Sequence, residues 1–476
     1  MTAIKRRYIH FAIMFLLTII ICMCPATGHI TAYGMKALGV FVGVLYGWIF
    51  IDLIWPSIFG FIALAITGVM PVTQALSSGF GNMTFLMMAT VLAFAGVLEA
   101  TGLADFLSTY LLKKHFFRKS PWRLIVGFCI IGYLLGIGNA SIASCLLLWS
   151  IFFHCVDNCD ISKSDPLVSF VVFMIVVASF SGNYILPFSS GAAIFLGFYT
   201  ESMQTAMPFI PYIIVLVVTT LLNIALTMIL GKYLLKVDAS KLVIPEEVVK
   251  KLDSKKTTKQ QKIGFVALIV YICALLLPEI IPGVPGMMFL KTLGLIGISV
   301  LGILVLGFLS VAGEPVVDLE KAFKNSMSWS LLMLLAITFP LADSLKSEDA
   351  GIMATINQVV MPVVSNMGPY ALLIAIMIIL GILTQFTHNI VLGAMFIPFL
   401  CPMIEEIGGN ATTMYIIIFL ALSAALVTPA GSAQAALLHG HESADRKSMY
   451  LMGIINLIAM WIILAVATIP LSNALF

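Results

Sequence analysis

The chain has 476 residues, of which 61% are hydrophobic and only 10% charged, with a formal net charge of +3. Soluble domains do not carry this much apolar surface, whereas successive apolar runs of about 17–25 residues are typical of helices that cross ~30 Å of hydrocarbon. The composition predicts an all-α polytopic membrane protein in contact with the lipid bilayer. It gives no reason to expect a nucleic-acid partner.

Residues 1–235 are predicted to form a first half that contains scaffold spans and one irregular region. Its spans are expected at 9–24, 37–54, 56–70, 83–112 and 208–235. Between them, residues 122–157 are predicted to be a re-entrant hairpin, because each arm of about 15 residues rises only ~22 Å. Residues 166–202 are predicted to be a membrane helix that is broken at 181–191.

The chain begins with basic residues followed by an apolar run, a pattern shared by signal peptides and by uncleaved first helices. We expect an uncleaved helix, because the small residues after Pro25 make a poor cleavage site. The eight cysteines show no recurring metal-ligand spacing, and we expect them to be free thiols.

A lysine-rich segment, residues 236–262, is predicted to be a cytoplasmic linker to a second half, residues 263–476. This half is predicted to repeat the order of elements of the first half. Its expected elements are spans at 263–280 and 290–310, an amphipathic stretch at 315–327, a long segment at 328–345, a hairpin at 369–402, a broken helix at 411–441 and a last span at 448–470.

The placement of basic residues tests this topology. With both hairpins re-entrant and the N-terminus in the cytoplasm, the chain has about 11 transmembrane helices and an external C-terminus. All Lys and Arg residues except Lys36, Lys291 and Lys346 then lie on the inner side, which leaves 22 of 25 inside (25 − 3). The positive-inside rule predicts such a bias. The two halves are therefore expected to form an inverted-topology repeat, in a bacterial-type plasma membrane.

Polar residues interrupt both predicted hairpins near their middle. Thr384, Gln385, Thr387, His388 and Asn389 lie within six residues of the second hairpin, and Gly138-Asn139-Ala140-Ser141 interrupts the first. Broken apolar segments in corresponding positions of two halves indicate the binding site of a secondary transporter. The alternative is a long helix whose polar side chains make interhelical hydrogen bonds.

The amide of an asparagine offers a carbonyl to a cation and N–H donors to a carboxylate, and helix N-termini favour anions. The hairpin tips and the helix breaks therefore supply our candidate residues. For substrate binding these are Asn139, Ala140, Ser141, Ser189, Ser190, Thr387, His388, Asn389, Thr428 and Pro429. For Na⁺, as the one ionic cofactor considered, they are Gly138, Asn139, Thr384, Asn389 and Ala425.

These residues resemble the divalent anion:sodium symporter (DASS, INDY-type) family of the ion-transporter superfamily. That family carries Ser-Asn-Thr at both tips, where this chain has Gly138-Asn139-Ala140 and His388-Asn389-Ile390. Of the two breaks, Thr428-Pro429-Ala430-Gly431 is a fair match and Ser189-Ser190-Gly191-Ala192 is a poorer one. The resemblance implies a homodimer in which a mobile transport domain moves against a fixed scaffold, as in an elevator.

The hydroxyl groups that the family places at the tips are missing here. His388 replaces one of them, and as a protonated imidazole it would repel Na⁺ while attracting an anion; as a neutral ring it could spare or ligate a cation. We therefore expect an exchanger or a carrier coupled to protons, with little need for Na⁺.

The predicted function is a secondary active transporter of small divalent or organic anions, such as di- or tricarboxylates. A metal-citrate carrier and a cation/proton antiporter are alternatives within the superfamily, although the antiporter would need carboxylates at mid-membrane that the hairpins and breaks lack. A channel is a further alternative. An intramembrane enzyme is not expected, because no span carries a Ser/His/Asp set, paired aspartates or a His-Glu-x-x-His motif.

Overall fold

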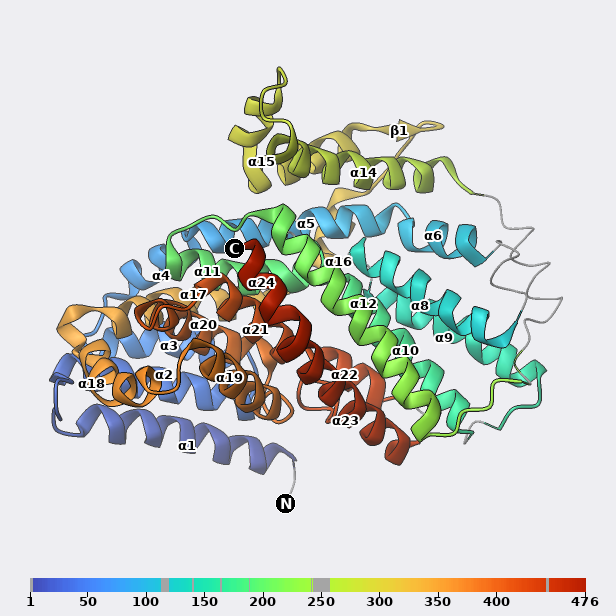
Figure 1. Cartoon of the computed structure of the whole chain (residues 1–476). Helices are drawn as coiled ribbons and strands as arrows, with labels where there is room; N and C mark the ends of the chain where they lie inside the picture. The colour runs from blue at the N-terminus through green and yellow to red at the C-terminus, as the bar shows by residue number, and fades with distance from the viewer. Residues whose placement is uncertain are drawn as a thin grey trace.

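The computed structural model describes residues 3–112, 120–138, 141–162, 165–187, 189–240, 242, 257–441 and 445–476. The described part of the first half consists of helices (Figure 1). They are α1 (Ala3–Met23), α2 (Ala32–Phe50), α3 (Trp55–Ile66), α4 (Val72–Phe80), α5 (Met83–Ala100), α6 (Leu103–Leu112), α8 (Pro121–Ile137), α9 (Ser141–Asn158), α10 (Pro166–Gly182), α11 (Ser190–Met203) and α12 (Phe209–Leu234). Most of the predicted linker, 236–262, lies outside the described residues.

The second half is also helical, apart from one short two-stranded sheet. Its helices are α14 (Lys259–Ile280), α15 (Met287–Phe308), α16 (Leu319–Ser326), α17 (Trp329–Lys346), η1 (Glu348–Ala350), α18 (Ile352–Ser365), α19 (Pro369–Leu383), α20 (Asn389–Glu406), α21 (Ala411–Ser423), α22 (Ala433–His439), α23 (Arg446–Ile463), η2 (Leu464–Thr468) and α24 (Ile469–Leu475). The antiparallel strands β1 (Ser310–Val311) and β2 (Glu314–Pro315) lie between α15 and α16.

Local sequence explains where the helices of the irregular region begin. Ser120 and Asp165 accept hydrogen bonds from backbone N–H groups of α8 and α10, and each is followed by a proline at the first helical position. A capping oxygen satisfies an N–H group that has no partner inside the helix, and proline has the backbone angle that the first turn needs. These starts agree with the expected hairpin at 122–157 and the broken helix at 166–202.

Nine helices of the described chain are long and apolar enough to cross a membrane. They include α9 and α20, the second arms of the two hairpins, each with 18 residues. The expectation that each arm of the first hairpin has about 15 residues is therefore wrong for α9, because 18 residues rise about 27 Å. Shorter apolar helices such as α3, α10 and α21 complete the membrane region, and the polytopic all-α fold class is confirmed.

The two halves pack against each other in a reciprocal way. The short helix α4 of the first half lies on α17, and the short helix α16 of the second half lies on α5. Both crossings are close: a Cβ atom added to Gly79 would overlap the backbone of Ala336, and one added to Gly96 would overlap the side chain of Ser326. Such matched contacts are those of an inverted repeat.

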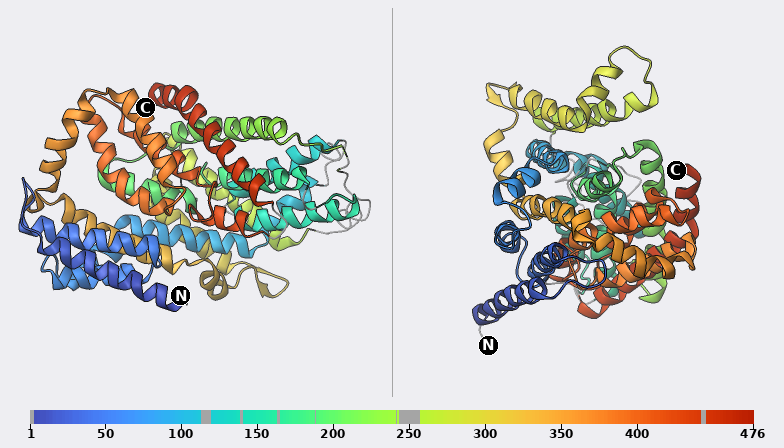
Figure 2. Two further views of the ribbon diagram at one scale, coloured as in Figure 1. Left: turned by 90° about the horizontal axis from the view of Figure 1, so that it is seen from below. Right: turned by 90° about the vertical axis from the view of Figure 1, so that its left-hand side faces the viewer.

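The same relation holds for the hairpins. Helix α10 packs against both arms of the first hairpin, α8 and α9, and α21 packs against both arms of the second, α19 and α20. Almost all residues of α10 and α21 are buried, so these two helices form the centre of the core. Figures 1 and 2 show the α1–α2 pair at one edge of the molecule and the α14–α15 pair at the opposite edge.

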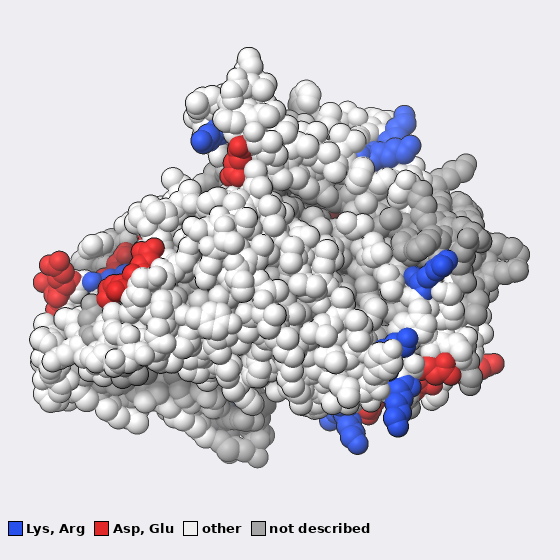
Figure 3. All heavy atoms as spheres, in the orientation of Figure 1, with Lys and Arg blue, Asp and Glu red and all other residues white. Residues whose placement is uncertain are grey.

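Charged side chains separate along the molecule. Figure 3 shows basic side chains mainly on the right of the visible face, over the ends of α12, α14 and α23, whereas acidic side chains predominate at its left. The broad middle of this face is uncharged, as expected for a surface that meets lipid.

Candidate functional site

The second hairpin tip consists of residues 384–388, which connect α19 to α20. The tip lies against the break between α21 and α22, residues 424–432. Thr384 is fully buried, and its hydroxyl donates a hydrogen bond to the carbonyl oxygen of Leu422 at 3.2 Å. The backbone N–H of Asn389 donates to the carbonyl oxygen of Gly431 at 3.3 Å. Tip and break therefore form one junction, which we call the second junction.

Gln385 joins the two sides of the second junction. Its side-chain amide nitrogen donates to the carbonyl oxygens of Gly381, at 2.9 Å, and Ala424, at 3.3 Å. Its side-chain oxygen accepts the backbone N–H of Val427 at 2.9 Å. These partners fix the orientation of the amide, because a carbonyl needs a donor and an N–H needs an acceptor. Our candidate residues omitted Gln385, although a buried glutamine in an apolar segment needs such partners.

The break contributes further polar groups. The hydroxyl of Thr428 donates to the backbone carbonyl of Gln385, and the hydroxyl of Ser432 donates to the carbonyl oxygen of Ala425 at 2.7 Å. Ser432 also accepts the backbone N–H of Ala435 at 3.1 Å and so begins α22. The structure thus brings together Thr384, Asn389, Thr428 and Ala425, which were predicted separately from the sequence. Pro429 is exposed beside them.

His388 is the residue that precedes α20, and its ring caps that helix. Its Nδ1 atom accepts the backbone N–H of Ile390 at 3.4 Å. The same N–H also donates to the side-chain oxygen of Asn389 at 2.9 Å, which is the shorter contact. A positive charge is unfavourable at a helix N-terminus. The neutral ring considered for His388 therefore suits this position better than the protonated one.

The first tip lies partly outside the described residues, because Asn139 and Ala140 are not among them. Ser141 begins α9, and its carbonyl oxygen accepts the hydroxyl of Ser144 at 2.9 Å. Ser144 also bonds the hydroxyl of Ser179 on α10 at 2.7 Å. These contacts attach the second arm of the first hairpin to the helix that precedes the first break.

The first break is closed by Ser189, whose hydroxyl donates to the backbone carbonyl of Asn183 and accepts the N–H of Ala192. The side-chain oxygen of Asn183 is buried and has no hydrogen-bond partner among the described residues. Gly138 and Ser189 line one cavity of about 20 Å³, next to α5 and α14. That volume suits about one water molecule, not a carboxylate anion.

Two other candidate residues contribute less to the described geometry. Ser190 begins α11, and its side chain is not described. Thr387 is half-buried at the second tip, where its backbone N–H donates to the carbonyl of Leu383.

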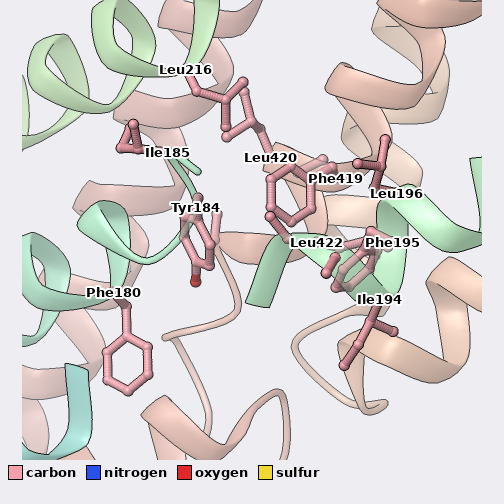
Figure 4. Close-up of a cluster of buried hydrophobic side chains, with 14 of the residues drawn as sticks. Phe180, Tyr184, Ile185, Ile194, Phe195, Leu196, Leu216, Phe419, Leu420 and Leu422 are labelled. Atoms are coloured by element: carbon pink, nitrogen blue, oxygen red, sulfur yellow. The ribbon is translucent and has the colours of Figure 1, made fainter. Parts of the chain in front are cut away.

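Tyr184 connects the two breaks. It belongs to the first break, and its ring lies 5.4 Å from that of Phe419 on α21, edge to face. Figure 4 shows both rings within one buried cluster, together with Phe195 of α11. The hydroxyl of Tyr184 also accepts a weak hydrogen bond from the side chain of Gln434 on α22, at 3.4 Å. The two breaks, although far apart in sequence, are therefore neighbours in the core.

The residues of the second junction do not fit a Na⁺ site. A Na⁺ site needs several oxygen atoms directed at one point. Two of the candidate oxygens already accept hydrogen bonds: the carbonyl of Ala425 accepts from Ser432, and the side-chain oxygen of Asn389 accepts the N–H of Ile390 at 2.9 Å. The hydroxyl of Thr384 donates to Leu422 and alone keeps its lone pairs, which is fewer oxygens than a Na⁺ site needs. The space between the carbonyls of Gly381 and Ala424 is occupied by an amide nitrogen.

Comparisons with known proteins agree with this architecture. Residues 40–392 match the family model described as "Citrate transporter" (CitMHS). Solute carrier family 13 member 4 of Homo sapiens is 26% identical over 156 residues, which are 33% of this chain and 24% of that protein. The chain thus matches about a quarter of the length of this relative.

A solved structure has a similar fold. The crystal structure of the YdaH transporter of Alcanivorax borkumensis superposes with a TM-score of 0.58 at 15% identity, covering 83% of this chain and 88% of that one. The predicted membership of the ion-transporter superfamily, on the DASS side, is confirmed, as is the prediction of a transporter in place of an enzyme. The family model covers most of the chain, and the chain therefore belongs to the citrate transporter family.

Proposed function

We propose that this secondary transporter carries small organic polyanions, with citrate and related di- and tricarboxylates as the substrate class, by an elevator-type movement. The single observation that carries the proposal is the second junction. There a buried hairpin tip and a helix break present hydroxyl, amide and backbone groups at the centre of an apolar protein.

The charge of the junctions supports an anionic substrate. Both tips and both breaks, residues 137–141, 181–191, 383–391 and 424–432, contain no aspartate or glutamate. An anion entering these regions meets the side-chain amide nitrogen of Asn389 and the N-termini of helices, without repulsion from a carboxylate. The same composition disfavours a cation/proton antiporter, which needs titratable carboxylates at this depth.

The packing supports a division into a scaffold and a moving part. We assign α8–α12 and α19–α24 to the transport domain, and the remaining helices to the scaffold. The sequence placed the span 208–235 in the scaffold, whereas we include its helix, α12, in the transport domain because it packs against α10 and α23. Helix α11 meets the scaffold closely, because a Cβ atom added to Gly197 would overlap the side chain of Thr84 on α5. The rings of Phe198 and Phe339 lie 6.5 Å apart at the same boundary. Packed helices at such a boundary can shift past each other in small sliding movements when one domain moves against another.

Three expectations from the sequence, on membrane orientation, oligomeric state and coupling, are part of this proposal. The N-terminus and the linker lie in the cytoplasm, since this orientation places most basic residues inside. The carrier is a homodimer, and it exchanges anions or couples their transport to protons.

The substrate class is tested by competition in proteoliposomes. Vesicles loaded with unlabelled citrate take up labelled citrate, and external citrate, succinate, sulfate or gluconate is added as competitor. We expect the di- and tricarboxylates to compete and the monovalent gluconate not to compete. Asn389→Ala provides the background rate, since its side chain lies in the second junction. Uptake that only monovalent anions or cations inhibit would contradict the proposal.

A further inference from the structure

From the hydrogen bonds of Gln385, we infer that its side-chain amide takes the place of a coupling cation in the second half, so that the second hairpin tip closes on its break without Na⁺. This inference rests on the proposed transport function and concerns the same site.

The side-chain amide of Gln385 connects the end of α19 to the end of α21. Its nitrogen lies within hydrogen-bond distance of two carbonyl oxygens, Gly381 on the last turn of α19 and Ala424 at the end of α21. Two carbonyl oxygens directed at one point attract either a cation or a group with two N–H donors. The NH₂ group supplies both donors and carries a partial positive charge, so it satisfies the carbonyls permanently.

The third partner of the amide is a backbone N–H group. The oxygen of the same amide accepts the N–H of Val427 on the far side of the break. A bound cation could not accept this hydrogen bond, whereas the glutamine satisfies the carbonyls and the N–H group together. Gln385 is only 4% exposed, so the carbonyl of Gly381 and the N–H of Val427 would be costly to leave without a partner, whereas the carbonyl of Ala424 also accepts the N–H of Leu426 at 2.9 Å. The amide therefore both replaces a cation and adds a contact that a cation lacks.

These hydrogen bonds also decide whether the binding of Na⁺ can affect the closing of the second tip. A cation that closes the tip must bind the closed junction more tightly than the open one, and only this difference shifts the equilibrium. At the second junction the carbonyls that would supply the difference already have their donors. Added Na⁺ should therefore leave both the stability of this junction and the opening of its tip unchanged.

The test compares Gln385→Glu with wild type and with Gln74→Glu, a matched change at an exposed position of α4. The carboxylate removes the two donors and places negative oxygen beside the carbonyls of Gly381 and Ala424, which creates the cation site that the glutamine prevents. We measure the thermal midpoint of the purified protein in increasing NaCl, against choline chloride at equal ionic strength. Gln385→Glu should gain an upward shift that saturates with Na⁺, absent from both other proteins. An identical Na⁺ response in all three proteins would overturn the inference.

A second measurement does not require that variant to fold. A cysteine is placed at Phe386, a tip residue that is 67% exposed, in a protein that lacks the native cysteines. Its rate of labelling by a water-soluble maleimide should agree within about twofold in Na⁺ and in choline, because Na⁺ does not shift the tip. A Na⁺-dependent change of tenfold would refute the inference. Neither measurement depends on transport. If the protein transported no carboxylate, that result would contradict the proposed function but not this inference about Gln385.

Discussion

Gly431 provides a direct test of the contact between tip and break, because it lies where the two backbones meet. A Cβ atom added there would lie 2.6 Å from the carbonyl oxygen of Thr384 and 3.1 Å from the Cβ atom of Ala425. Neither neighbour is the far end of a flexible side chain, so Gly431→Ala must push the tip away from the break. Overpacking of this kind costs about 1–3 kcal/mol.

The displacement also affects a hydrogen bond. The carbonyl oxygen of Gly431 accepts the N–H of Asn389 at 3.3 Å, and this bond would lengthen or break. Its loss adds about 0.5–1.5 kcal/mol. The closed junction is then destabilised by about 1.5–4.5 kcal/mol, which lowers its population by about tenfold or more relative to open arrangements. We expect citrate uptake to fall by at least about tenfold, while the protein still folds.

The assay is initial uptake of labelled citrate into proteoliposomes, normalised to the amount of protein reconstituted. Gly283→Ala is the matched control, because an added Cβ atom there meets no atom within 4 Å. The control should transport like wild type, and both variants should elute as a single species after solubilisation. Wild-type uptake by Gly431→Ala would show that the observed contact between tip and break is not needed for transport.

Three further predictions concern the tips, the topology and the domain boundary. Asn389→Ala and Asn139→Ala should each abolish transport with membrane expression intact, and wild-type transport by either would remove that asparagine from the site. In a cysteine-free protein, a cysteine at Lys291 should react with an impermeant reagent only from outside, and one at Lys447 only from the cytoplasm. Labelling of both from one side would refute the topology. Gly197→Ala should destabilise the protein by about 1–3 kcal/mol, since its Cβ atom overlaps Thr84. Thr84→Ala should recover most of that loss in a double-mutant cycle of thermal stability, and purely additive effects would contradict the close contact.

The order of helices could be predicted from the sequence because membrane spans depend on local composition. Apolar length, basic flanks and the Ser-Pro and Asp-Pro starts of α8 and α10 are all local signals. The break within the predicted segment 83–112 was not foreseen. It occurs at Gly102, which adopts a positive φ of 76° between α5 and α6. A glycine in an apolar segment does not by itself reveal that conformation.

The last span was also predicted as regular, but it contains the π-helical segment η2. Thr468 in this segment pairs with the hydroxyl of Thr219 on α12 at 2.8 Å, and its own hydroxyl also reaches the carbonyl of Ile463. The segment ends just before Ile469 and Pro470, and this proline, which cannot continue a regular helical ladder, is a local signal of the irregularity. The hydroxyl partner on α12, about 250 residues away in the chain, could not be predicted from a local pattern.

The site was predicted in part for the same reason. Polar residues in apolar segments indicated the second tip and the second break, because uncompensated polar groups are costly in a membrane, whereas Asn139 and Ala140 of the first tip lie outside the described residues. The roles of individual residues depended on distant partners. Gln385 bonds Ala424 and Val427 across 39 and 42 residues, and the ring of His388 is oriented by the N-terminus of α20.

The central claim, that this protein is a carrier of polycarboxylate anions, is tested most directly by counterflow. Proteoliposomes are loaded with unlabelled citrate and diluted into a trace of labelled citrate, with choline as the external cation. The account predicts a transient accumulation of label above the equilibrium level, which requires loaded citrate and is absent in Asn389→Ala. Simple equilibration of label at the same rate in loaded and empty vesicles would indicate a channel and contradict the claim.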